Sequence, residues 1–294
     1  MAVNIGLGLL FGIINTLILH LSKAMERHGI DIFTRKKSFK EKGKKPVIYI
    51  VGVILNNTII IWQIIGTTFA SAAVFSSVFG LGLILLMLYS HYILHEAIKP
   101  PELIGAILII AGTTIVGILY IWEPISSENV NFFNFFVLLI IITILFTILI
   151  GFSAKTRIGV ALIFGGVAGT CGGLDNVFKR IGLKSMNFIQ AFAGVFKLDP
   201  ISFIFLVSFF IGFVAFILTQ VGFAKGADAS KLVPMYNSLY ILAPITFELI
   251  IIVDATISIG KIISIAIIVI GIFLMNIFKE TEKRIQKENL TENV

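Results

Sequence analysis

The sequence predicts an all-α integral membrane protein with about nine transmembrane helices, arranged as an inverted repeat. Of the 294 residues, 57% are hydrophobic and only 13% are charged, and a soluble domain normally has about twice this charged fraction. Apolar stretches long enough to cross a bilayer follow one another along nearly the whole chain. Two groups of these stretches are also related to each other in sequence. Together these observations exclude an ordinary soluble enzyme and a fibrous or disordered protein.

Nine apolar stretches give the expected helices, and each has about the 20 residues that a helix needs to cross the hydrocarbon core. A basic loop at 23–45 separates the first two stretches, and a polar tail at 279–294 follows the last. Neither polar segment is long enough to form a separate domain. The predicted spans are 3–22, 46–65, 70–94, 102–122, 131–152, 158–178, 201–223, 232–253 and 259–278.

Basic residues lie mainly on one side of the predicted bundle. If the loop at 23–45 is cytoplasmic, 18 Lys and Arg residues lie on the inner side and five on the outer side. Cytoplasmic loops of multi-pass proteins carry such an excess, so we expect an N-terminus outside and a C-terminal tail in the cytoplasm. The net charge of +7 then reflects membrane topology, and we expect no nucleic-acid partner.

The outer loop after the sixth predicted span has apolar residues at helical spacing between 188 and 196. This pattern is typical of a short amphipathic helix that lies in the outer headgroup layer. An ordinary long loop is the alternative.

The first and sixth spans are similar in sequence. Residues 5–29 align without gaps to residues 158–182, and eight of the 25 positions are identical. A shift of 159 residues relates later positions of the two halves. The matched pairs include Gly12 with Gly165, Gly29 with Gly182, and Gly112 with Gly271.

The chain therefore divides into a first half at 1–122, a spacer helix at 123–157, a second half at 158–278 and the tail. Because the spacer is a single crossing, the two halves enter the membrane in opposite directions. Such an inverted repeat is typical of secondary transporters, whose substrate path lies between the halves near the middle of the bilayer.

The segment at 70–118 combines a helix of small residues, a His95-Glu96 turn and an apolar helix with a central glycine. This pattern resembles the fourth and fifth helices of the drug/metabolite transporter superfamily, and its second copy runs over 228–278. The nine-span plan, the positions of the long loops and the motif ASKLVPMYNSLY at 229–240 are similar to the NIPA-type magnesium transporter branch. The resemblance implies a transporter that moves Mg²⁺ or another divalent cation through a cavity between the repeats. The alternative is an EamA-type permease for a small organic metabolite.

Polar residues inside the predicted spans mark the expected substrate or ion path, because ionisable groups in a bilayer are costly and usually functional. Glu248 has no Lys or Arg within four residues and is the first candidate for a metal ligand or a proton carrier, with a protonated Glu hydrogen-bonded within the bundle as the alternative. Asp175 is the second candidate metal ligand, with pairing to Lys179 at i,i+4 as the alternative. For Asn56 and Asn57, structural hydrogen bonds between helices are the alternative. The predicted path comprises Glu248, Asp175, Asn176, Asn56, Asn57, Asn237 and Asn15.

The sequence contains no Walker loop, HExxH or GxSxG motif, so we expect no enzymatic activity. Its single cysteine excludes a disulfide framework and a thiolate zinc site. We expect no cofactor apart from the transported Mg²⁺. The expected partners are the lipid bilayer and the transported cation or small solute, and a homo-oligomer is left open.

Overall fold

The regular elements that the structure describes are helices. The computed structural model describes residues 4–30, 43–70, 75, 78–96, 98–122, 130–156, 159–183, 188–197, 199–251, 253 and 257–274. Among these residues there is no strand, so the predicted all-α class is confirmed. In this part of the chain seven helices are long and apolar enough to cross a membrane, as expected of a multi-pass integral membrane protein.

The helices follow the predicted spans in order. The seven long ones are α1 (Ile5–Gly29), α2 (Lys45–Phe69), α5 (Pro100–Trp122), α6 (Phe132–Thr156), α7 (Val160–Leu183), α9 (Pro200–Ala224) and α10 (Ala229–Ile251). Two shorter apolar helices occupy the positions of the third and ninth predicted spans. They are Phe79–Tyr92, in which the 3-10 turn η2 (Phe79–Leu81) leads into α4 (Gly82–Tyr92), and Ile259–Leu274. A further helix, α8 (Phe188–Phe196), confirms the helical interpretation of the loop after the sixth span.

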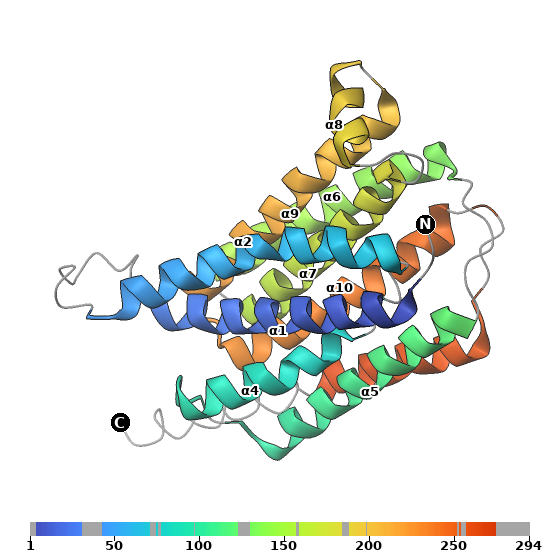
Figure 1. The fold of residues 1–294 in the computed structure, drawn as a ribbon. Helices are drawn as coiled ribbons and strands as arrows, with labels where there is room; N and C mark the ends of the chain where they lie inside the picture. Colours follow the sequence, from blue (N-terminus) through green and yellow to red (C-terminus); the bar gives the residue numbers. More distant parts are fainter. Residues whose placement is uncertain are drawn as a thin grey trace, which may run out of the picture.

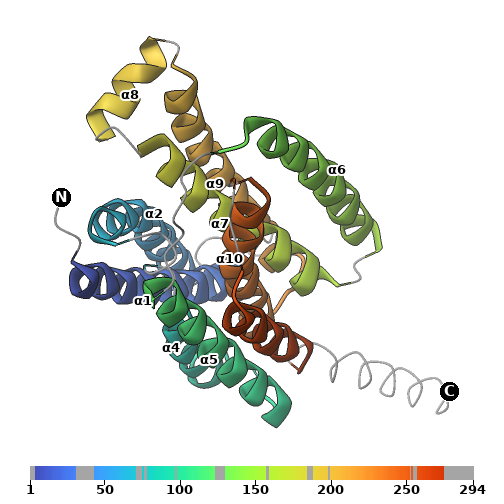
Figure 2. The same ribbon diagram turned by 90° about the vertical axis from the view of Figure 1, so that its right-hand side faces the viewer.

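The helices pack as two groups side by side in one bundle (Figure 1). In the first group α1 packs along α2 and α4, and in the second α7 packs along α9 and α10. Figure 2 shows α6 at the edge of the bundle, where it contacts α7 and α10. The short helix α8 lies at the end of the bundle that holds the N-terminus.

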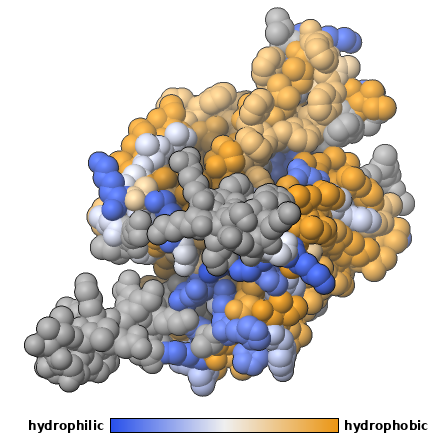
Figure 3. Space-filling model, turned by 90° about the vertical axis from the view of Figure 1, so that its left-hand side faces the viewer, coloured by the Kyte–Doolittle hydropathy of each residue, from blue (hydrophilic) through white to orange (hydrophobic). Residues whose placement is uncertain are grey.

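The surface has the distribution of side chains expected of a protein in a bilayer. Large hydrophobic residues are exposed along the helices, and α6 is the clearest case, with Phe133 76% and Ile148 63% exposed. Figure 3 views the end of the bundle opposite the N-terminus. Hydrophilic side chains gather at this end, whereas hydrophobic ones cover the flanks.

The first helix extends further than predicted. Its apolar stretch was expected to end at residue 22, but α1 continues to Gly29. The predicted start of the polar loop at residue 23 is therefore wrong. Hydropathy falls at Lys23 and Glu26, whereas both side chains are buried, with 2% and 0% of their surface exposed. The helix continues because neighbouring helices enclose these two charged residues.

A buried histidine joins the two groups of helices. His20 of α1 has its Nδ1 atom 2.6 Å from the carbonyl oxygen of Thr16, which can only accept, so Nδ1 carries the proton. Its Nε2 atom therefore accepts a hydrogen bond of 2.7 Å from Nδ2 of Asn237 in α10. The same Asn237 amide donates to the carbonyl oxygen of Phe79 in η2. This polar contact fixes α1, η2 and α10 against one another.

A second link between the groups lies at the turn after α4. His95 has a φ of 54°, in the left-handed region that glycine favours. The turn directs the Glu96 carboxylate to the start of α10, where it accepts hydrogen bonds from the backbone N–H groups of Ala229 at 3.1 Å and Ser230 at 3.0 Å. Arg27 of α1 lies 3.9 Å from the same carboxylate. A carboxylate is favourable at this position because the N-terminus of a helix carries partial positive charge.

The helix Ile259–Leu274 packs against α5 through a glycine on each side. A Cβ atom on Gly112 of α5 would lie 3.0 Å from the backbone oxygen of Ser264. One on Gly271 would lie 2.7 Å from the backbone oxygen of Gly105 in α5. Each glycine therefore allows the backbone of the other helix to approach closely, as small residues do in membrane bundles.

Candidate functional site

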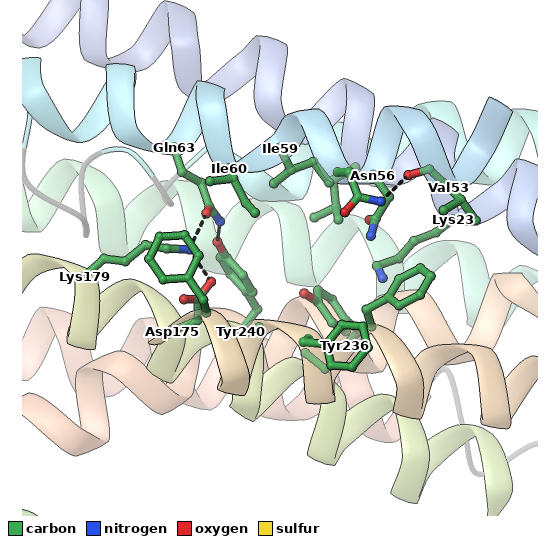
Figure 4. Close-up of a pocket in the computed structure, with 18 residues that line it drawn as sticks. Lys23, Val53, Asn56, Ile59, Ile60, Gln63, Asp175, Lys179, Tyr236 and Tyr240 are labelled. Atoms are coloured by element: carbon green, nitrogen blue, oxygen red, sulfur yellow. Dashed lines mark hydrogen bonds and ion pairs between the residues drawn. The ribbon is translucent and has the colours of Figure 1, made fainter. Parts of the chain in front are cut away.

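A cavity of about 430 Å³ lies between the two groups of helices. The first group contributes α1 and α2 to its wall, and the second contributes α7, α9 and α10 (Figure 4). Most of the wall is apolar or aromatic, but six residues with charged or amide side chains also line it. They are Lys23, Asn56, Asn57, Gln63, Asp175 and Lys179.

One end of the cavity holds a buried ion pair within a hydrogen-bond network. Nζ of Lys179 lies 2.6 Å from Oδ2 of Asp175, so the pairing considered for Asp175 is present. Nζ of Lys179 also donates to Oε1 of Gln63 at 3.2 Å, and Nε2 of Gln63 donates to the Tyr240 hydroxyl at 2.9 Å. The Asn176 amide donates to the same hydroxyl. This network connects α7 with α2 and α10.

The other end of the cavity holds Lys23 of α1 (Figure 4). Its Nζ atom lies 4.3 Å from the centre of the Tyr236 ring and donates a long hydrogen bond of 3.4 Å to Oγ1 of Thr219. An ammonium group over an aromatic face is attracted by the negative charge of the π system. The two ends thus carry different chemistry, an ion pair at one and, at the other, a lysine that forms no ion pair among the described residues.

A buried carboxylate lies beside this second end, behind Lys23. Glu26 is fully buried, and its Oε2 atom accepts a hydrogen bond of 2.5 Å from Nε2 of Gln220 in α9. Oε1 of Gln220 accepts in turn from the Tyr49 hydroxyl at 3.0 Å. Glu26 is not part of the cavity wall, and no ion pair with Lys23 is found in the described part of the chain.

The two neighbouring asparagines of α2 both line the cavity. Asn57 donates from Nδ2 to the carbonyl oxygen of Val53 at 2.8 Å, one turn earlier in the helix. Oδ1 of Asn56 lies 3.5 Å from the Ser22 hydroxyl. Of the predicted path, the cavity wall therefore contains Asp175, Asn56 and Asn57, while Asn176 contacts it through Tyr240.

The remaining predicted path residues lie elsewhere. Asn237 is outside the cavity wall and forms the link to His20 described above. Asn15 is fully buried outside the cavity wall, and its side-chain amide has no hydrogen-bond partner among the residues described. Glu248 belongs to α10, but its side chain lies outside the described part of the structure.

Sequence reasoning missed Lys23, Gln63, Tyr236 and Tyr240 as site residues. The last two are spaced i,i+4 in α10, which places both on one helix face, and this spacing was a usable signal. Lys23 was missed because the predicted first span ended one residue before it. Gln63 gave no signal of its own, since a single amide in an apolar span also fits a structural hydrogen bond.

The charge of the cavity wall is positive. It contains two lysines and one aspartate, and the aspartate is already paired. The wall also offers amide and hydroxyl groups that can donate hydrogen bonds to a solute. Within the described residues no group of three or more His, Cys, Asp or Glu side chains could hold a metal ion.

Comparison of the chain with protein-family models, with curated proteins and with solved structures finds no match.

Proposed function

We propose that the chain is a multi-pass membrane transporter that moves a small organic solute through the cavity between its two groups of helices. The cavity is the observation that supports this proposal. Charged and amide side chains inside an apolar bundle are costly, so they are usually retained for function. The cavity volume of about 430 Å³ also lies in the usual range for small-molecule sites.

The proposed architecture is an inverted repeat of four and four helices around the spacer α6, with the two shorter apolar helices as the third and ninth spans. Equivalent glycines support this arrangement. A Cβ atom on Gly12 would lie 2.6 Å from the backbone oxygen of Phe75, and one on Gly165 would lie 2.5 Å from that of Leu232. Each matched glycine thus packs where the third helix of its own half begins. Gly112 and Gly271 are a further pair of equivalent positions in the two halves. Their reciprocal packing, which joins α5 to the helix Ile259–Leu274, also supports the inverted repeat.

Magnesium transport, the first expectation from the resemblance, has less support. Mg²⁺ binds hard oxygen ligands, usually one or two carboxylates together with water. The carboxylate of Asp175 is already paired with Lys179 at 2.6 Å, and Lys23 adds a second lysine to the wall. A divalent cation in this cavity would be repelled by the ammonium group of Lys23, whose charge no ion pair balances in the described residues. An organic solute has no such conflict, so we favour the permease.

Proteoliposomes containing the purified protein test this proposal. We expect uptake of at least one member of a radiolabelled panel (an aromatic carboxylate, an amino acid, a sugar and an organic cation) above that of empty vesicles. Entry of Mg²⁺, followed with an entrapped fluorescent indicator, should stay at the level of empty vesicles. Entry of Mg²⁺ without uptake of any organic solute would overturn the proposal in favour of the cation transporter.

A pair of glycine variants ties the transport to the cavity. Gly212 lines the cavity, and a Cβ atom there would lie 3.0 Å from Oδ2 of Asp175, so Gly212→Leu should fill the space and abolish uptake. Gly151 of α6 has no atom within 4 Å of its Cβ position, so Gly151→Leu is the matched control and should transport normally. Equal uptake by the two variants would mean that the solute does not pass through this cavity.

A further inference from the structure

The two lysines of the cavity have different surroundings. Lys179 has a carboxylate partner at 2.6 Å and an amide oxygen at 3.2 Å. Lys23 is equally buried, with 2% of its surface exposed, but its only hydrogen-bond acceptor in the described residues is the neutral hydroxyl of Thr219 at 3.4 Å. A buried ammonium group normally has a carboxylate within reach. Lys23 therefore lacks the kind of partner that Lys179 has.

The Glu26 carboxylate attracts Lys23 through space but forms no ion pair with it in the described part of the chain. Glu26 lies three residues further along α1, but its Oε2 atom accepts from Gln220 rather than from Lys23. The side chain of Glu26 is outside the cavity wall, whereas that of Lys23 is part of it. Figure 4 shows Lys23 extending from α1 into the space above Tyr236. The free side of the amine thus faces the cavity.

The wall around Lys23 suits a solute with an apolar body. The Tyr236 ring lies beneath Nζ, and Phe213 and Phe216 of α9 line the same cavity. Aromatic walls bind flat or apolar groups through burial and ring contacts. A solute that has one anionic group and an aromatic or apolar body would satisfy both features at once.

We infer that the solute is a small organic anion, whose carboxylate binds Nζ of Lys23 while its apolar body packs against the aromatic wall. This inference rests on the proposed transport function and names the chemical class of its solute. Lys23 is then the specificity-determining residue of the site. The Asp175–Lys179 pair at the other end is a fixed part of the wall, because its charges already neutralise each other.

Calorimetric titration of the purified protein with two probes tests this inference. Hippurate and hippuramide differ only in that the first has a carboxylate and the second a neutral amide. A charge-assisted hydrogen bond to a buried group should make hippurate bind roughly 10- to 100-fold more tightly than hippuramide. This comparison uses the wild-type protein and does not depend on whether a variant folds.

Three variants then identify the lysine. Lys23→Met should weaken hippurate binding to the level of hippuramide, and Lys23→Arg should keep the preference for the anion. Lys155→Met removes the same charge from an exposed position of α6 outside the cavity and should bind hippurate as the wild type does. Tryptophan-monitored melting checks that each variant is folded.

The inference is overturned by equal binding of the two probes, by unchanged hippurate binding in Lys23→Met, or by no hippurate binding at millimolar concentration. Tighter binding of phenylalanine than of hippurate would also overturn it, since the solute would then be a zwitterion. Failure of the proposed function gives a different result. Uptake of a neutral solute without hippurate binding would support the proposed transport but contradict an anionic solute. Hippurate binding through Lys23 without uptake of any solute would support the binding site but contradict the proposed transport.

Discussion

Replacing Lys179 with methionine should strongly destabilise the protein. The Asp175 and Lys179 side chains are only 9% and 7% exposed, and their charged atoms lie 2.6 Å apart. Without Lys179 the carboxylate would stay buried with no opposite charge, and Gln63 would lose a hydrogen-bond donor. Breaking a buried ion pair in this way costs about 3–5 kcal/mol. We expect the free energy of unfolding to fall by an amount in this range.

A less buried ion pair of nearly the same length provides the comparison. Nζ of Lys231 lies 2.7 Å from Oδ2 of Asp228, but these side chains are 13% and 35% exposed. Solvent screens this pair more strongly than the first, so Lys231→Met should cost less than Lys179→Met. The substitution is the same in the two variants, whereas the exposure of the carboxylate that loses its lysine differs, 9% for Asp175 and 35% for Asp228.

Unfolding of the purified protein in mixed micelles with increasing SDS, followed by circular dichroism, measures these free energies. The double variant Asp175→Asn, Lys179→Met should cost less than the sum of the two single variants, because neither charge is then left alone. Equal losses in Lys179→Met and Lys231→Met, or strictly additive losses in the double variant, would refute the argument from burial.

Three further predictions concern the ends of helices and the topology. Glu96→Ala should lower the free energy of unfolding by about 1–2 kcal/mol, because two backbone N–H groups at the start of α10 lose their acceptor. Glu96→Gln keeps an acceptor, so it should lower the free energy of unfolding by less in the same SDS titration. The pKa of Asp199 lies below its usual value because the side chain and backbone of Ser202 donate to the carboxylate. The stabilising effect of the Asp199 carboxylate on α9 should therefore be full above about pH 4 and be lost as the pH falls through the lowered pKa. A difference in stability between wild type and Asp199→Asn that stays constant on acidification would contradict this. Finally, a cysteine at position 293, in a background without Cys171, should react with an impermeant maleimide only after the cells are opened, and labelling of intact cells would reject the cytoplasmic C-terminus.

The long helices could be predicted from the sequence because a bilayer imposes a strong compositional rule on every spanning segment. This rule is local and needs no knowledge of neighbouring helices. It was wrong at the end of α1, where Lys23 and Glu26 lower the hydropathy although the helix continues to Gly29. A charged residue inside a bundle is stabilised by partners on other helices, and hydropathy along one segment does not include those partners.

The cavity could be predicted only in part. The sequence identified Asp175, Asn56 and Asn57 because polar residues in an apolar span are conspicuous. It grouped them with Asn237, which the structure places in a link between helices instead. Whether an asparagine faces a cavity or a neighbouring helix depends on helix rotation and on contacts such as that between His20 and Asn237. These contacts join residues more than 200 positions apart, and spacing along the chain does not reveal them.

The contrast between α6 and α7 has a consequence for how the sequence can change over evolution. Only 6% of the apolar stretch of α6 is buried, against 78% of that of α7. Selection on α6 therefore acts mainly on the average hydrophobicity of the helix, so one aliphatic residue can replace another at most of its positions. In α7 a substitution such as Gly169→Ala would place a Cβ atom against the backbone of α10. Relatives of this protein should thus differ most in α6 and least in α7, and an alignment weighted toward α7 would detect distant relatives most sensitively.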